Sequence, residues 1–537
     1  MKKIFSIILL LFSIIGIASA QSEYQPYSYQ FYQKLNADLY STQTREHTAI
    51  KSLIIDSLLR HRYDSLMNYG TNNSQNGWNF FSSHLIDVKS PKSTFYLDVL
   101  PDLGIGRDFS GKLTTNATSV GLQVGGTFGD KLYYNISGYQ NSAIFPQYLS
   151  TYINQVGIVP GQAYARTYQN NGYDWSYLTA VLSYTPVKFL NISAGRDKTF
   201  IGDGYRSELL SDYASPYPFF KLTATLGNVK YMALWAYMND PYYANATGND
   251  VKKWAVFHYL DWNISNRLSF GLFDSIIWYT VDNETGRSRG FDVTYLNPIL
   301  FLRPVEAANG SPDNALLGAT GKYKISDGVT FYGQFALDEF QSQYFFSNDG
   351  SSRNKYGWQL GVRGPNLFAV KGLNYLLEYN TAKPYTYSEH SITENYSDNN
   401  EPLAHPWGAN FRELVALLNY SYKRFDISAE ADFGRYGLDV NGLNYGKDIF
   451  QLYDYPARYP ATILGNYTGQ GLTTNMVYAE AKVAYVLNPK YNLRIELDGI
   501  YRTENNSQFS DKTTWLTIGI RSSFRAVYND LASYRTH

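Results

Sequence analysis

Two adjacent carboxylates in "FYGQFALDEFQ", Asp338 and Glu339, are the first residues of this chain whose type and spacing could do chemistry. Paired acids carry out glycoside hydrolysis, in which one protonates the leaving group and the other acts as nucleophile or base. Neighbouring residues of a strand point to opposite faces, so only one of these two can face a common site unless a bulge intervenes. We therefore predict one inward charge and one turn or capping residue, and not a catalytic pair.

The other motifs with catalytic potential are incomplete. The seven histidines are scattered and show no HExxH or paired ligand spacing. "GIGRDF" at 104–109 and "GDGYRS" at 202–207 each contain two glycines of a dinucleotide-binding loop without the third, so we interpret them as turns or tight contacts. No GxSxG nucleophile elbow is present. The sequence predicts no catalytic residue, no metal and no cofactor, and thus a protein that is not an enzyme.

The N-terminus predicts export. Lys2 and Lys3 precede the apolar run from Ile4 to Ile17, and a small-residue "ASA" ends at Ala20, which is the pattern of a secretory signal peptide over residues 1–20. The chain contains no Cys, so a lipid-anchored cysteine and a disulfide framework are both excluded.

The composition suits a membrane interface more than a soluble domain. Charged residues make up 17%, below the roughly 25% of soluble domains, while 51 Tyr and 30 Phe bring the aromatic fraction to 17%. Tyrosine has an apolar ring and a hydroxyl that can hydrogen-bond to water, which suits the belts of aromatic residues at the two membrane–water interfaces. The 46 basic residues balance 46 acidic ones, which makes nucleic acid an improbable partner. After the signal peptide no apolar stretch approaches the roughly 18 residues of a spanning helix.

Period-two alternation dominates after residue 90. In "RFDISAEADF" the apolar residues Phe425, Ile427 and Phe433 alternate with acids, and "NLRIELDGIY" and "VYAEAKVAYV" repeat the pattern with Arg494, Glu496 or Lys482 on the polar face. Segments of about ten residues, joined alternately by short turns and long loops, are typical of an outer-membrane barrel. We predict a large antiparallel transmembrane β-barrel of roughly 16–18 strands over residues 91–524, with outer-membrane lipid around it and the long loops exposed on the surface of a Gram-negative bacterium.

The two flanking regions differ from the barrel. Residues 21–90 form a partly helical periplasmic or plug region, because Ile50, Leu53, Ile54 and Leu58 are spaced as one helical face. The segment "WLTIGIRSSF" resembles a closing strand, but residues 525–537 follow it. Either this extension folds back into the lumen or the last strand is misplaced.

Two polar or aromatic segments are candidate polysaccharide-binding or lumen-plug sites. The segment from Phe301 to Gly318 contains Pro304, and Pro298 lies shortly before it. Each proline removes a backbone donor from the strand ladder, so the chain must leave the sheet there. An inward fold that plugs the pore or contacts a ligand fits its charges better than a disordered loop. In the loop 448–469, aromatic rings can stack on sugar rings and polar groups can bind sugar hydroxyls. The alternative is that this loop is an interfacial anchor or a packed lid. The candidate residues are Arg206, Arg303, Glu306, Asp313, Asn314, Asp338, Glu339, Tyr453, Tyr455 and Tyr459.

These motifs also carry a resemblance. "NPILFLRPVEAANGSPDNALLG" and "FYGQFALDEFQ", with "GRDKTFIGDGYRSELLSDYASPYPFFKL" upstream, resemble the Wzi-type capsule-assembly outer-membrane proteins and the related RemB-like gliding-motility proteins over roughly Ser93 to Phe524. The resemblance implies an eighteen-stranded barrel with an N-terminal helical region that acts as a lectin for capsular polysaccharide. The positions that match these motifs are Gly202, Gly204, Arg206, Arg303, Glu306, Asp313, Asn314, Asp338 and Glu339.

Three functions are consistent with the sequence. The first is non-enzymatic attachment or organisation of capsular or extracellular polysaccharide. The second is a diffusion channel, porin-like, lined by residues such as Arg494, Glu496 and Lys482. The third is a role in gliding motility, with motility or secretion machinery proteins as partners, which the sequence does not separate from the first.

Overall fold

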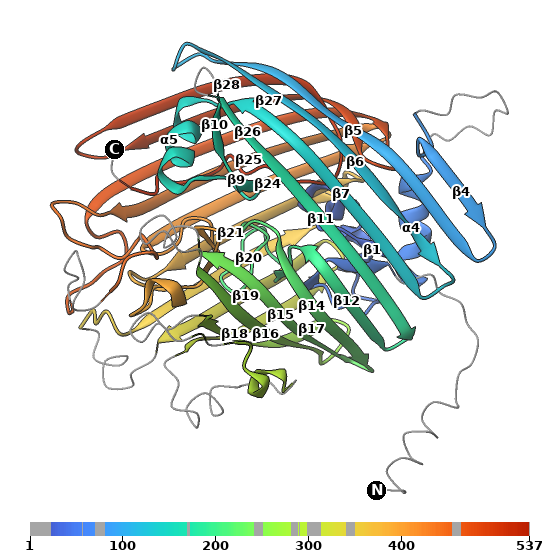
Figure 1. The fold of residues 1–537 in the computed structure, drawn as a ribbon, viewed down its shortest axis with the longest axis horizontal. Coiled ribbons are helices and arrows are strands. Elements are labelled where there is room, and N and C mark those ends of the chain that lie inside the picture. The colour runs from blue at the N-terminus through green and yellow to red at the C-terminus, as the bar shows by residue number, and fades with distance from the viewer. Residues whose placement is uncertain are drawn as a thin grey trace, which may run out of the picture.

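The chain forms a closed antiparallel barrel of 18 strands in a computed structural model (Figure 1). The structure describes residues 23–55, 57–69, 81–168, 172–240, 251–280, 288, 290–297, 313–339, 349–453 and 463–535. Each strand pairs with the next along the chain, and the last strand closes the barrel on the first through the Ile518↔Ile105 register. The prediction of a large antiparallel barrel is confirmed, and the observed number of strands lies at the upper end of the expected range.

The barrel strands are β5 (Ser93–Asp108), β6 (Leu113–Phe128), β7 (Leu132–Ile144), β11 (Gly172–Val187), β12 (Leu190–Asp197), β14 (Tyr217–Leu226), β15 (Val229–Asp240), β16 (Val251–Asn263), β17 (Leu268–Tyr279), β18 (Asn314–Ser326), β19 (Val329–Glu339), β20 (Lys355–Gly364), β21 (Leu373–Ala382), β24 (Phe411–Tyr422), β25 (Phe425–Leu438), β26 (Leu472–Asn488), β27 (Leu493–Asn505) and β28 (Ser510–Arg521).

The two faces of the wall follow the alternation in the sequence. Outward residues such as Ile105, Phe331 and Leu360 are at least half exposed, with exposed fractions of 67%, 50% and 60%. Inward residues of the same strands are polar or aromatic and buried, as Asp102 and Tyr332 illustrate. The outward row is what a bilayer would contact, because lipid offers no partner for polar side chains. Among the described residues, no helix has the length and apolarity to cross a membrane.

The connections differ at the two ends of the barrel. Eight short ones lie at one end, which we call the turn end: 129–131, 188–189, 227–228, 264–267, 327–328, 365–372, 423–424 and 489–492. At the opposite end, which we call the loop end, the connections that contain described residues are 109–112, 145–171, 198–216, 280–313, 340–354, 383–410, 439–471 and 506–509. The predicted alternation of short turns and long loops is therefore confirmed, with 423–424 and 489–492 among the turns.

The N-terminal segment enters the lumen at the turn end. It comprises β1 (Glu23–Gln25), α2 (Tyr29–Gln33), α3 (Asn36–Leu39), β2 (Ile50–Lys51), β3 (Leu53–Ile55) and α4 (Ser57–Met67). Tyr24 donates to Asp197 of the wall at 2.8 Å, and Lys34 pairs with Asp426 at 2.7 Å. Figure 1 shows α4 and β1 at the end of the barrel opposite the C-terminus.

The predicted helical face of this segment is wrong in its first half. Ile50, Leu53 and Ile54 lie in β2 and β3, and only the part from Ser57 is helical. β2 pairs with a loop strand, Phe200↔Lys51, and β3 pairs with β1. Tertiary pairing with partners distant in sequence has overridden the local spacing.

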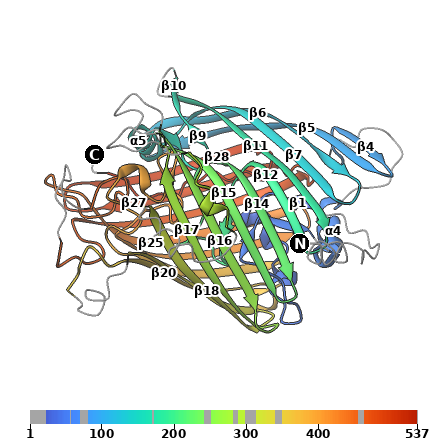
Figure 2. The same ribbon diagram turned by 60° about the horizontal axis from the view of Figure 1, so that its bottom comes forward.

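Several long connections also fold inward, because their side chains are buried in a common core. They contain short elements, of which Figure 2 labels α5 and β9 near the loop end. The short elements are α5 (Gln147–Val156), β8 (Ile158–Val159), β9 (Ala163–Tyr164), β13 (Phe200–Ile201), η4 (Ile392–Glu394), β22 (Ser397–Asp398) and β23 (Glu401–Pro402). The remaining elements outside the closed barrel are β4 (Ile86–Ser90), β10 (Arg166–Tyr168), η2 (Val293–Leu296) and η3 (Leu367–Ala369).

The C-terminal extension runs through the lumen from the turn end to the loop end. The amide of Ser523 donates to Tyr491 in a turn at 2.7 Å, Arg502 donates to the carbonyl of Leu531 at 3.0 Å, and Arg535 pairs with Asp448 of a long loop at 2.9 Å. The predicted closing strand is β28, and of the two alternatives for the extension, folding back into the lumen is the one observed.

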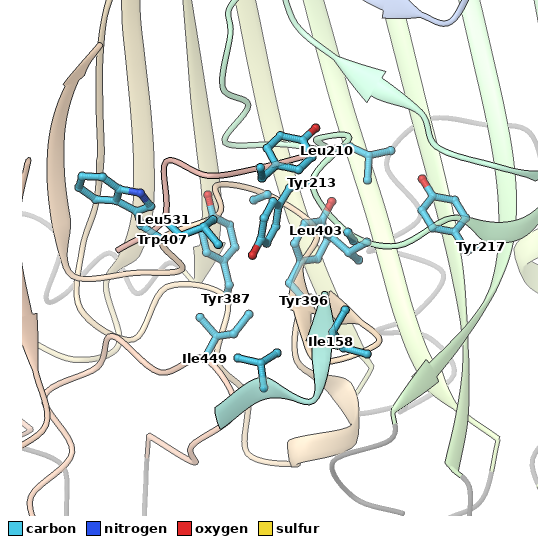
Figure 3. Close-up of a cluster of buried hydrophobic side chains, with 14 of the residues drawn as sticks. Ile158, Leu210, Tyr213, Tyr217, Tyr387, Tyr396, Leu403, Trp407, Ile449 and Leu531 are labelled. Carbon is cyan, nitrogen blue, oxygen red and sulfur yellow. The ribbon is translucent and has the colours of Figure 1, made fainter. Parts of the chain in front are cut away.

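Loops and extension together build a hydrophobic core inside the barrel near the loop end (Figure 3). The buried side chains of Tyr213, Tyr387, Tyr396 and Trp407 meet there, each contributed by a connection and not by a strand. Trp407 lies directly on the wall at Gly434, where an added Cβ would be 2.0 Å from the indole ring.

Gly434→Ala therefore tests how tightly this core seats on the wall. The added methyl overlaps the ring, and overpacking of this kind costs about 1–3 kcal/mol, so we expect a lower temperature for the shift in electrophoretic mobility that accompanies barrel unfolding. The control is Gly104→Ala, another inward wall glycine, where the nearest atom to the new Cβ is 3.7 Å away. Equal transition temperatures for both variants would contradict the packing described.

Candidate functional site

A buried lysine gathers three carboxylates at the loop end. Lys355 is the first residue of β20, and its Nζ lies 3.5 Å from Asp338, 3.4 Å from Glu339 and 3.7 Å from Glu389. Its side chain is fully buried, whereas Glu339 and Glu389 are partly exposed. We call Asp338, Glu339, Lys355, Glu389, His390 and Tyr453 the mouth cluster.

A β-bulge brings the two adjacent acids together. The pairing of β19 with β20 shifts between Leu337↔Tyr356 and Glu339↔Lys355, which leaves Asp338 as the extra residue. A bulge breaks the alternation of side chains and re-aims them. The prediction that only one of Asp338 and Glu339 faces inward is therefore wrong, because the strand contains a β-bulge, the one exception that the prediction allowed.

Tyr453 and His390 complete the mouth cluster. The Lys355 Nζ lies 3.9 Å from the centre of the Tyr453 ring, a cation–π contact. The Tyr453 hydroxyl is 2.9 Å from both Glu339 Oε2 and His390 Nε2. His390 is exposed, and Asp338 accepts the amide of Tyr387 at 2.7 Å. The cluster thus presents carboxylate and imidazole groups to solvent over a fixed, buried ammonium.

The remaining predicted candidates fall into two groups. Asp313 accepts from the Tyr295 hydroxyl at 2.6 Å and Asn314 donates to the carbonyl of Glu394 at 2.7 Å, so both hold neighbouring segments at the loop end. Arg303, Glu306, Tyr455 and Tyr459 lie outside the described residues. The inward fold expected for the stretch around Arg303 therefore remains a prediction.

Arg206 lies in the lumen, in the connection between β12 and β14. Its guanidinium pairs with Glu413 at 2.8 Å and with Asp530 of the C-terminal extension at 2.7 Å, and Asp432 is 3.7 Å away. Arg206 is 2% exposed and Glu413 is fully buried. This residue links the connection to the wall and to the C-terminal extension, and unlike the mouth cluster it does not reach solvent.

The hydrogen bonds of His405 fix its tautomer. The amide of Trp407 donates to Nδ1 at 3.1 Å, so the proton is on Nε2, which donates to Glu413 at 2.7 Å. Burial lowers the pKa of His405 below its ordinary value, although Glu413 acts in the opposite direction. The imidazole is therefore a neutral donor that orients the Glu413 carboxylate toward Arg206.

The glycines of "GDGYRS" permit close approach to the wall. A Cβ on Gly204 would lie 2.1 Å from a Glu378 carboxylate oxygen, and Gly202 has a φ of +141° beside Gln334. With both glycines in place, the amides of Tyr205 and Arg206 donate to Glu378 at 2.9 and 3.0 Å. The interpretation of this motif as a tight contact is consistent with this geometry.

A cavity of about 200 Å³ remains between the wall and the plug. It is lined by strands β5, β6 and β24–β28 and by both terminal segments. The charged groups predicted to face the lumen line it in pairs, with Arg494 and Glu496 at 2.7 Å and Lys482 and Glu480 at 2.7 Å.

Sequence reasoning missed the partners that organise both charged sites. Lys355, Gln359 and Arg363 share the inward face of β20, a polar alternation that could have drawn attention to Lys355. Glu413, His405 and Asp530 carried no comparable local signal, because they come from a wall strand, a connection and the C-terminal extension, and only the tertiary fold brings them to Arg206.

Solved structures with a similar fold are outer-membrane proteins. Wzi of Escherichia coli, described as involved in group 1 capsule assembly and as a carbohydrate-binding β-barrel, aligns over 79% of this chain and 85% of its own, with 15% identity and a TM-score of 0.50. The outer-membrane protein OprD of Pseudomonas aeruginosa aligns over 85% and 100%, with 11% identity and a TM-score of 0.41. OccAB2 of Acinetobacter baumannii aligns over 79% and 97%, with 9% identity and a TM-score of 0.43. At these identities the likeness concerns the fold alone. No family model and no curated protein matches the sequence.

Glu401 joins three of the inward connections. Its carboxylate accepts from the amide of Gly161 at 2.6 Å and from the amide and hydroxyl of Ser215 at 2.8 and 2.7 Å. Burial raises the pKa of Glu401 to about 7, against these hydrogen bonds and the nearby charge of Lys198.

The raised pKa predicts a pH dependence of the plug. The folded form binds this proton more tightly than the unfolded chain does, so its stabilising contribution is complete at low pH and is lost as pH rises from about 4.5 to about 7. We expect the amides of Gly161 and Ser215 to exchange hydrogen faster across this window, after correction for intrinsic rates, by up to about tenfold per pH unit. Glu401→Gln should remove the slope and Glu389→Gln should keep it; a slope of opposite sign in the wild type would contradict the assignment.

Proposed function

We propose that this protein is an outer-membrane barrel with a plugged lumen that binds an extracellular or capsular polysaccharide, without catalysis, at its loop end. The observation that carries the proposal is the mouth cluster, in which Glu339, Glu389 and His390 reach solvent above the buried Lys355. The long loops would then face the cell exterior and the turns the periplasm, with lipid against the apolar outer row.

The chemistry of the mouth cluster suits saccharides. Sugar hydroxyls donate to carboxylates, and hydrogen bonds to a charged acceptor contribute about 1.5–3 kcal/mol each. The ion pairs to Lys355 hold the acids in position before a ligand arrives, which lowers the entropy lost on binding. The capsule role and carbohydrate binding described for Wzi support the same proposal. The resemblance of the "RPVE", "SPDN" and "DEF" motifs to those of Wzi-type capsule-assembly proteins also supports it.

The same activity would serve either capsule retention or gliding motility. The resemblance to RemB-like proteins favours a partner in the motility or secretion machinery, and the resemblance to Wzi-type proteins favours the capsule. A deletion strain scored for both capsule retention and cell spreading separates these two roles.

The alternative is a diffusion channel, and the cavity beside the plug is the observation that favours it. Its lining charges could select ions. Against it stand the ion pairs made by those charges and the segments that enter the lumen, among them 24–55, 198–216, 383–410 and 523–535.

Glycan binding to the purified barrel tests the main proposal. We expect saturable binding of extracellular polysaccharide from the producing strain, weakened about tenfold by Glu339→Gln because one charge-assisted hydrogen bond is lost, and weakened further by Glu389→Gln or Tyr453→Ala. Asp327→Asn, the same type of change at the turn end, is the control and should bind as the wild type does. Equal affinity of the wild type and of Glu339→Gln combined with Glu389→Gln would remove the mouth cluster from the proposal.

A further inference from the structure

Three carboxylates converge in the lumen away from the mouth cluster. Glu430 and Asp432 are two residues apart on β25 and both face inward, and Asp530 reaches them from the C-terminal extension. One oxygen of each lies within 4.8 Å of the others. This cluster therefore joins the wall to the extension.

Two of these acids have buried oxygens without hydrogen bonds. Asp432 is fully buried, and the described residues outside the cluster offer no hydrogen-bond donor to either of its carboxylate oxygens. Its nearest cation, Arg206, is 3.7 Å away, beyond hydrogen-bond distance. Oε1 of Glu430 also lacks a partner. Leaving buried carboxylate oxygens unsatisfied costs free energy, so this arrangement calls for a further positively charged partner.

The guanidinium of Arg206 is already committed. Its Nη1 pairs with Asp530 at 2.7 Å, and its Nη2 and Nε donate to Glu413 at 2.8 and 3.3 Å. In the described part of the chain, one guanidinium thus faces four carboxylates, and the neighbouring His405 is neutral. The carboxylate oxygens that lack a hydrogen-bond partner among these residues belong to Asp432 and Glu430.

We propose that Glu430, Asp432 and Asp530 bind a hard divalent cation, namely Ca²⁺. An all-oxygen set of carboxylates is the preference of Ca²⁺, which takes 6–8 oxygen ligands and accepts irregular geometry. Glu430, Asp530 and the Tyr205 hydroxyl, which lies 3.1 Å from Asp530, border the cavity of about 200 Å³. Water from that cavity completes the coordination shell, and the cavity is also the route of entry.

The site gives the extension a metal clamp. Because Asp530 belongs to the extension and the other two ligands belong to the wall, the cation links the two directly. The sequence predicted no metal, since its histidine pattern matches no site and Asp530 lies about a hundred residues from Glu430 and Asp432. Only the return of the extension through the lumen brings the three acids together. The clamp is independent of the proposed polysaccharide binding.

Metal analysis of the full-length protein in detergent tests this site. We expect one Ca²⁺ per chain after equilibration with Ca²⁺ and removal of excess, and at least tenfold weaker binding in Asp432→Asn. The matched control is Glu504→Gln, a buried carboxylate that also holds the extension, through the amide of Ser533 at 2.8 Å, but lies outside the cluster. It should bind Ca²⁺ with unchanged affinity.

A second readout does not depend on the variants folding. Chelation of the wild type should speed hydrogen exchange in residues 525–535 several-fold, and Ca²⁺ should restore protection while Mg²⁺ does so only weakly. Wild-type protein that binds no stoichiometric Ca²⁺, or an Asp432→Asn variant that folds and binds Ca²⁺ as the wild type does, would overturn the proposal.

Discussion

The width of the barrel is the constraint on which the rest of the structure depends. A wall of 18 strands encloses more space than its own inward side chains can fill, and barrels of this size contain either water or additional chain. This protein fills much of its lumen with its own chain: the N-terminal segment from the turn end, long connections from the loop end, and the C-terminal extension along the whole length. Because the wall offers a polar inner face, each of these segments must bring complementary charge.

The plug meets that requirement with two kinds of contact. Near the loop end, Tyr213, Tyr387, Tyr396 and Trp407 make a hydrophobic core that resembles the interior of a soluble domain. Beside this core, Arg206 links a connection, two wall strands and the extension through carboxylates. Buried ion pairs of this kind add little net stability relative to apolar packing, but removing one partner is costly. We therefore infer that Arg206 mainly fixes the positions of the connection and the extension relative to the wall.

The sequence predicted the wall well and the plug poorly, for a physical reason. Strand periodicity is local, so "RFDISAEADF" and "NLRIELDGIY" reveal both faces of β25 and β27 without knowledge of their neighbours. Contacts between segments distant in the chain leave no such pattern. The pairing of Lys51 with Phe200 replaced an expected helix by a strand, and a single bulge turned Asp338 and Glu339 toward one lysine. Asp338, Glu339 and Tyr453 of the candidate site were predicted from their residue types. Lys355 was missed, because its local signal is only the polar alternation of β20 and its carboxylate partners are brought to it by tertiary contacts.

The most direct test of whether the chain closes its own lumen is ion conductance through the purified protein in planar lipid bilayers. We expect a wild-type barrel without stable channels. We expect conductance to appear when residues 524–537 are removed, and this conductance also shows that the protein has inserted. Large and stable conductance of the wild type, equal to that of the truncated chain, would contradict a lumen filled by the protein itself.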